Sequence, residues 1–118
     1  MKPYKHGRIS AKQFGGLPED YQDIHDFIDH TKQNLPDVRH RMLLHNSWGC
    51  FLVEKVFGVT RINSEGFEYS PRDIAEQHVI DDLGFIPTLE RCFQNVPLEK
   101  WLGGPRIKGQ SKKQLVVD

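Results

Sequence analysis

The stretch from Asp37 to Phe57 constrains the fold more than any other part of the sequence. Asp37 is a suitable helix N-cap and Gly58 a suitable stop, so we expect one long helix between them. At 3.6 residues per turn, apolar side chains cover most of its circumference, and such a helix is normally central and wrapped by others. One narrow polar line remains, formed by His40, Ser47 and Glu54 at intervals of seven residues.

The flanking segments predict further helices and one hairpin. Runs at 60–62 and 67–69 flank a glycine-containing turn at 63–66, which is typical of a short β-hairpin. The fold class is therefore mainly α: a compact helical domain of about four helices around a central apolar helix, with one short β-hairpin insertion. The other expected elements are a helical turn at 11–14 capped by Ser10, a helix from Pro18 to about Gln33, a helix at 71–83 between Ser70 and Gly84, a helix from Leu89 to about Val96, and a last turn at 98–102.

The chain of 118 residues has the size of one domain, which we assign to residues 1–103. Residues 104–118 are rich in Gly and Lys and are expected to form a flexible basic tail. A solubilising terminus and an arm that contacts a partner or a nucleic acid both stay open for this tail.

Charge and hydropathy exclude several classes of protein. Lys plus Arg total 16 and Asp plus Glu total 16, so the net charge is zero and nucleic-acid binding is disfavoured. No apolar run reaches the roughly 20 residues of a membrane span, and the N-terminus has no apolar signal region. We therefore expect a cytoplasmic protein without membrane contact. Cys50 and Cys92 do not make a disulfide framework, and Cys50 is expected to be an inert thiol.

Three histidines from three expected helices lie on or beside apolar faces: His25, His45 and His78. Imidazole is the commonest metal ligand in proteins, and Glu76 falls inside an apolar arc, so these four residues are the candidate metal ligands. Zinc, manganese or iron is the expected ion. For each histidine taken singly, a hydrogen-bonded core residue and an acid or base group remain alternatives.

Other polar residues are candidates for the surroundings of this centre. Asp37 with His40, and His78 with Asp81, place a carboxylate and an imidazole on one helix face, so each pair is a ligand pair or a carboxylate that orients a histidine. Glu54 shares the polar line of His40. Arg39 and Arg41 are candidates for binding an anion, with solvated surface charges as the alternative. His6 and His30 are expected to be peripheral.

Several segments resemble a family of small bacterial and phage proteins that is described only as a domain of unknown function. The similarity covers nearly all of the chain except the basic tail, and its most specific parts read R-H-R-x-L-x-H, beginning at Arg39, and E-Q-H-V-x-x-D-L-G, beginning at Glu76. The resemblance implies a stand-alone cytoplasmic protein of a bacterium or a phage-infected cell, with no activity to carry over. It also implies polar positions at His25, His40, His45, Glu54, Glu76 and His78. The chain departs from this pattern at Asn46, where relatives often carry a second histidine beside the first.

These observations lead to three functional hypotheses. The first is a phage or prophage accessory protein with a buried histidine and carboxylate centre that binds a metal and, if it is an enzyme, catalyses hydrolysis. The second is a non-catalytic protein that binds a host defence or replication protein, and self-association through opposite charges fits the same features. The third, disfavoured by the zero net charge, is contact with nucleic acid through the basic tail.

Overall fold

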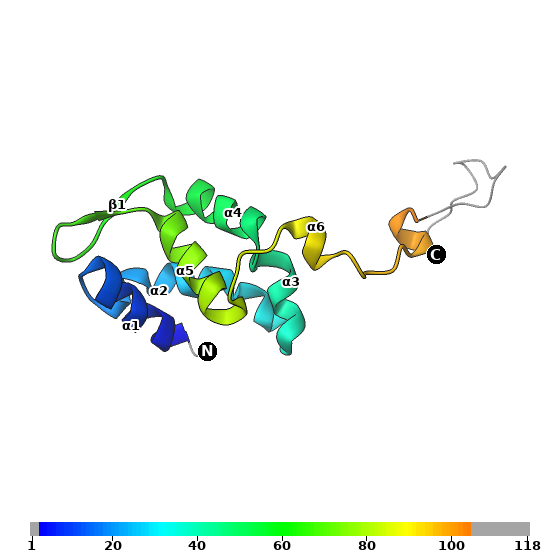
Figure 1. Ribbon diagram of the computed structural model, residues 1–118, viewed down its shortest axis with the longest axis horizontal. Coiled ribbons are helices and arrows are strands. Elements are labelled where there is room, and N and C mark those ends of the chain that lie inside the picture. The colour runs from blue at the N-terminus through cyan, green and yellow to red at the C-terminus, as the bar shows by residue number, and fades with distance from the viewer. Residues whose placement is uncertain (1–2, 105–118) are drawn as a thin grey trace.

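The computed structural model describes residues 3–104 and consists mainly of helices with one short antiparallel hairpin, as predicted (Figure 1). The basic tail lies outside the described residues, apart from Gly104. Within residues 3–104 no helix is long and apolar enough to span a bilayer. The elements are α1 (Pro3–Phe14), η1 (Pro18–Tyr21), α2 (Gln22–Ile28), η2 (His30–Gln33), η3 (Val38–His40), α3 (Arg41–Leu44), α4 (Ser47–Phe57), β1 (Arg61–Ile62), β2 (Glu68–Tyr69), α5 (Pro71–Leu83), α6 (Leu89–Cys92) and η4 (Lys100–Leu102).

Helix α5 is the element around which α1, α2 and α4 pack (Figure 1). Its bounds agree with the prediction because local chemistry defines both ends. The Ser70 hydroxyl accepts a hydrogen bond from the N–H of Asp73, and Pro71 occupies the first turn. Gly84 ends the helix in the left-handed conformation at φ 84°, which a residue with a side chain rarely adopts.

The apolar core lies where α2, α4, α5 and the hairpin meet. Tyr21 and Tyr69 pack edge to face there, with ring centroids 4.9 Å apart. In the hairpin, Arg61 is opposite Tyr69 and Ile62 is opposite Glu68, which confirms the predicted strand pairing. The buried core residues are Tyr21, Ile24, Ile28, Cys50, Val53, Tyr69, Ile74, Ala75 and Val79.

The single helix predicted over residues 37–57 is not formed. It is divided into η3, α3 and α4 by a break at His45 and Asn46. The Asn46 side chain stabilises both ends of the break, since its Oδ1 accepts from Gly49 N at 2.9 Å and its Nδ2 donates to the carbonyls of Met42 and Leu43. A Cβ atom at Gly49 would lie 1.9 Å from the Leu44 carbonyl oxygen, so only glycine fits there.

The break places α4 at the surface instead of the centre. Trp48 and Phe51 are each 40% exposed and Val56 is 55% exposed. The prediction assumed one continuous phase of 100° per residue, and the change of direction at Asn46 invalidates that assumption. The helix predicted from Pro18 to Gln33 is likewise divided, into η1, α2 and η2, with Asp29 between α2 and η2.

Helix α1 begins at Pro3, well before the helical turn predicted at residues 11–14. Ser10 is therefore not a cap but a buried residue inside the helix, and its hydroxyl donates to the carbonyl of His6 at 3.0 Å. His6, one turn earlier on the same face, is fully buried, so the expectation that it is peripheral is wrong. His30 is exposed, as expected.

After α6 the chain leaves the helical body, which we define as residues 3–93. Thr88 caps α6 by accepting from the N–H of Arg91 at 3.1 Å, but the helix ends at Cys92, earlier than the predicted Val96. Residues 94–104 form an extended segment, called the arm below, which runs away from the body and carries η4 near its far end (Figure 1).

Candidate metal centre

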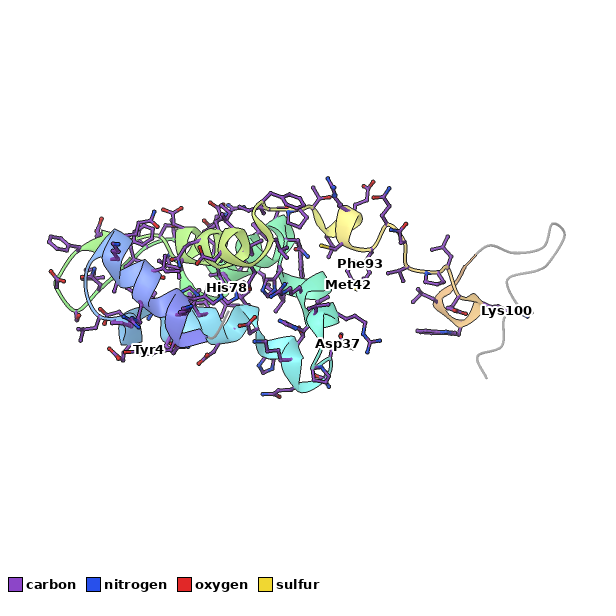
Figure 2. The ribbon with its side chains drawn as sticks, turned by 60° about the horizontal axis from the view of Figure 1, so that its bottom comes forward. Tyr4, Asp37, Met42, His78, Phe93 and Lys100 are labelled. Atoms are coloured by element: carbon purple, nitrogen blue, oxygen red, sulfur yellow. The ribbon has the colours of Figure 1, made fainter. Side chains whose placement is uncertain are left out.

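Helix α5 presents His78 and Asp82 on one face, one turn apart. The Nε2 atom of His78 lies 3.2 Å from an Asp82 carboxylate oxygen. His78 is fully buried and the Asp82 side chain is 4% exposed. Figure 2 shows His78 in the middle of the body, close to where α1 and α2 pass. One helix therefore contributes both an imidazole and a carboxylate to the interior.

The ends of two other helices contribute the partners of this pair. Asp29 follows the last residue of α2, and His45 follows the last residue of α3, at the break described above. The Nε2 atom of His45 is 2.9 Å from Asp82 Oδ2 and 3.4 Å from Asp29 Oδ1, and the Nε2 atom of His78 is 3.2 Å from Asp29 Oδ1. Two nitrogens and two oxygens from three segments thus converge.

The spacing of these four atoms matches that of ligands around a single ion. Two ligands each about 2.0–2.1 Å from a tetrahedral zinc ion lie about 3.3 Å from each other. The four nitrogen–oxygen distances between the two imidazoles and the two carboxylates range from 2.9 to 3.4 Å. All four candidate ligand atoms lie within 4.8 Å of one another. The donor set could therefore hold a metal ion.

A third imidazole faces the same oxygen of Asp29. The Nδ1 atom of His40 lies 2.7 Å from the carbonyl oxygen of Asp37, which can only accept, so Nδ1 carries a proton. In the neutral ring Nε2 then holds a lone pair, and this atom lies 3.5 Å from Asp29 Oδ1. A lone pair directed at a carboxylate is favourable only when a cation lies between them or when the ring itself becomes charged.

A chain of hydrogen bonds also determines which nitrogen of His78 is available. Gln77 donates to the His6 carbonyl and to Asp81, so its Oε1 is the acceptor that faces Ser10. The Ser10 hydroxyl has one proton, which faces the carbonyl oxygens of Gln77 and His6, so its oxygen accepts from His25 Nε2 at 2.8 Å.

With its proton on Nε2, a neutral His25 presents the Nδ1 lone pair to His78. The two Nδ1 atoms are 2.9 Å apart, so His78 Nδ1 is the donor. The Nε2 atom of His78, which faces both carboxylates, is thereby left as an electron-pair donor. The histidine tautomers thus direct lone pairs of His40 and His78 at the place where Asp29 and Asp82 also point.

His6 packs against one face of the His78 ring but does not belong to the convergent set of ligand atoms. The two rings stack with centroids 3.7 Å apart and an interplanar angle of 18°. Nitrogen atoms of His6, His25 and His78 also lie within 4.8 Å of one another, but lone pairs lie in the ring planes, so stacked rings do not aim at a common point. His6 Nδ1 instead lies 3.1 Å from Asp81, and its Nε2 lies 3.3 Å from Asp82 Oδ1.

Burial and charge shift the pKa values of this cluster in opposite directions. Burial and the charge of His78 lower the pKa of His45 to about 4 and, with His6, lower that of His25 to about 3. Burial also lowers the pKa of His78, but hydrogen bonds and charges from Asp29 and Asp82 outweigh it, so the pKa is raised above 6.5. Burial tends to raise the pKa of Asp29, yet His78 holds it at about 2. Without a metal, a protonated His78 thus supplies the positive charge that faces Asp29 and Asp82.

The structure brings the three predicted histidines together, so the buried histidine centre is confirmed. His45 and His78 belong to the convergent set, whereas His25 contacts His78 from behind. Glu76 does not take part, since its side chain is 41% exposed and lies 3.8 Å from Arg72 on the surface. Its position within an apolar arc was misleading because the arc extends to the edge of α5, where Ile80 is also exposed.

The predicted surrounding residues are divided in the same way. His40 borders the centre, and Asp37 orients it through its backbone carbonyl, while the Asp37 carboxylate pairs with Arg39 at 2.9 Å on the surface. Arg41 is half-buried, with Nη2 3.9 Å from Asp82 Oδ1. Two further predicted residues lie outside the convergent set: Glu54, 3.8 Å from Arg72, and Asp81, which contacts His6 and Gln77 instead of His78.

Asp29, Asp82 and His6 were missed, although a common signal marks them. Each lies four residues from another buried polar residue on the same helical face: His6 from Ser10, Asp29 from His25, and Asp82 from His78. The prediction paired His78 with Asp81 at a spacing of three and did not consider Asp82. A search for spacings of four would have found all three pairs.

The fold and the site define a mainly helical protein with a buried centre of histidines and aspartates. A family model matches residues 1–102, and the chain belongs to that family, which is described as Domain of unknown function (DUF6915). No curated protein and no solved structure matches the chain.

Proposed function

We propose that this protein binds one divalent metal ion through Asp29, His45, His78 and Asp82. The observation that carries the proposal is the convergence of two carboxylate oxygens and two imidazole nitrogens at mutual distances of 2.9–3.4 Å. In the metal-free state the proton on His78 Nε2 would be shared between the two carboxylates, and His45 Nε2 would donate to Asp82. His40 Nε2, 3.5 Å from Asp29, is the candidate for a further ligand.

The donor set favours particular metals. Imidazole and carboxylate ligands without thiolate suit zinc, manganese and ferrous iron, and the two carboxylates balance the charge of a divalent ion. Because Asp29, His45 and His78 are almost completely buried, the ion would be enclosed and would link α2, α3 and α5. Binding energy would then appear as folding stability.

Hydrolysis is the second candidate function, and the position of Arg41 is the observation that favours it. Its guanidinium reaches the edge of the centre beside Asp82, and its Nε atom is buried without a hydrogen-bond partner among the described residues. A fixed positive charge at this place suits a negatively charged group near the metal. When bound, a divalent metal supplies an activated water for such chemistry.

Metal content and thermal unfolding of the untagged protein test the metal proposal. We expect close to one equivalent of zinc, manganese or iron after purification, and a lower melting temperature after removal with a chelator that returns on adding one of these ions. Asp82→Asn should abolish metal retention, whereas Glu76→Gln, a matched change at a surface position of the same helix, should not. A folded protein that retains no metal and shows no shift with any of the three ions would contradict the proposal.

The finer expectations from the sequence stay predictions. They are a phage or prophage origin, a cytoplasmic location, a host-protein partner, a single unit at residues 1–103 and a flexible basic tail.

A further inference from the structure

The arm ends in an exposed apolar turn. Leu98 is 69% exposed, Trp101 70% and Leu102 57%. The turn is held by its own backbone, since Leu102 N and Gly104 N both donate to the Glu99 carbonyl, at 3.1 and 2.9 Å. The shape that presents the Trp101 indole is therefore local and does not depend on contact with the helical body. An exposed tryptophan flanked by two exposed leucines is typical of a surface that another molecule covers.

The helical body has an open apolar groove beside the root of the arm. Its lining residues come from α3, α4 and α6: Leu43, Trp48, Leu89 and Phe93, with Glu90 at the rim. Its volume is about 520 Å³, within the range of pockets that hold large side chains. Leu43, Trp48 and Phe93 are each about 40% exposed in spite of their size, so the groove is also uncovered.

We propose that two copies of this chain exchange arms, so that Trp101 and its flanking leucines occupy the groove of the other copy. The course of the chain favours a second copy over the arm's own groove. The arm begins directly after Phe93, which lines the groove, and leads away from it, with Lys100 near the distant end (Figure 2). When two such chains are related by a twofold axis perpendicular to the arms, the arms lie antiparallel and the end of each meets the root of the other.

Charge supports the same pairing. Glu90 lies at the rim of the groove, and Lys100 immediately precedes Trp101 on the arm. When the indole enters the groove of the partner, Lys100 comes to the rim where Glu90 lies. A symmetric dimer contains two copies of the arm–groove contact. The total buried area is therefore twice that of one contact, which brings it closer to the roughly 1,200 Å² of a stable interface.

Sedimentation velocity of the full chain over a range of concentrations tests the proposal. We expect a monomer–dimer equilibrium, and Trp101→Ala should raise the dimer dissociation constant at least about tenfold, because buried tryptophans are frequent hot spots. The matched control is Ile62→Ala, which removes a side chain that is 66% exposed on the hairpin, far from the arm in sequence. A chain that stays monomeric at all concentrations, or a dimer that Trp101→Ala leaves unchanged, would overturn the proposal.

Two pairs of variants separate exchange from other modes of association. Glu90→Lys and Lys100→Glu should each weaken the dimer, and the double variant should restore it. A mixture of Trp101→Ala, whose groove is intact, with Leu43→Asp, whose arm is intact, should form heterodimers that are tighter than the homodimer of either variant, because one arm–groove contact is restored. Failure of both rescues would overturn arm exchange, as would a monomer in which Trp101 is protected from a soluble quencher, since the arm would then cover its own groove.

Discussion

The Nδ1 atom of His25 lies 2.9 Å from the Nδ1 atom of His78, so one proton is held between two buried imidazoles. Ser10 accepts a hydrogen bond from Nε2–H of His25, so Nδ1 of a neutral His25 is an acceptor and the shared proton belongs to His78. This relationship is what leaves Nε2 of His78 free to bind a cation. His25 is thus a positioning residue for the centre, although the sequence had suggested a ligand.

His25→Leu should weaken metal binding without removing a ligand. The substitution deprives His78 Nδ1 of its acceptor, and loss of such an outer partner typically costs 10–100-fold in metal affinity. Competition with a chromophoric chelator measures the affinity. His30→Leu, at an exposed position, should leave it unchanged, and an unchanged affinity in His25→Leu would show that His78 needs no such support.

His40→Gln and Asp37→Ala should have opposite profiles. His40 directs a lone pair at the centre, so its loss should lower metal affinity by about tenfold. Asp37 orients His40 through its backbone carbonyl, which alanine retains, so Asp37→Ala should keep the affinity. It should lose only the helix cap to Arg39 N and the surface ion pair with the Arg39 side chain, which is a small loss of stability. Chelator competition and chemical denaturation separate the two effects, and equal losses of affinity would contradict this assignment.

Metal-free protein should lose stability as the pH falls below about 6.5. His45 and His25 have pKa values of about 4 and 3 in the folded state, so between these values and 6.5 the unfolded chain binds more protons than the folded chain. Each of the two groups then costs about 1.4 kcal/mol per pH unit. The raised pKa of His78 contributes a constant stabilisation below pH 6.5, which is lost only as the pH rises above 6.5.

Urea denaturation in the presence of a chelator, at several pH values, measures this dependence. Stability should rise from pH 4 to about 6.5. A flat profile over this range would mean that the buried imidazoles do not stay neutral.

Gly49→Ala should destabilise the protein by about 3 kcal/mol or more. The added Cβ would lie 1.9 Å from the Leu44 carbonyl oxygen, and this contact is with backbone that cannot rotate away. Because the same turn contains His45, metal affinity should fall as well. Ser47→Ala, at an exposed position in the same turn, should change stability by less than about 0.5 kcal/mol. A tolerated Gly49→Ala would show that the break at Asn46 can relax.

The parts of the fold that the sequence predicts are those with local signals at both ends. Ser70, Pro71 and Gly84 define α5, and the glycine-containing turn defines the hairpin. The break at His45 and Asn46 has no such signal, because the apolar pattern continues through it and the stabilising bonds of Asn46 depend on the structure already formed.

The candidate site follows the same division. Periodicity identifies His25, His45 and His78 as inward-facing, since each lies beside an apolar face. Periodicity does not identify Asp29 and Asp82, because a carboxylate is assumed to be solvated until its partner is known. Their partners come from distant positions in the chain: His78 lies 49 positions from Asp29, and His45 lies 37 positions from Asp82.

Helix α5 carries buried residues on two sides, with Ile74, Ala75 and Val79 toward the apolar core and Gln77 and His78 toward the polar layer. A helix with buried residues on two sides has no single apolar face that would determine its rotation about its own axis. A turn of 100° would still bury apolar groups, but it would replace His78 and Asp82 by Val79 and Leu83 and leave Asp29, His25 and Ser10 facing hydrocarbon. The polar layer thus determines the orientation of α5 about its own axis, and it does so whether or not an ion is bound.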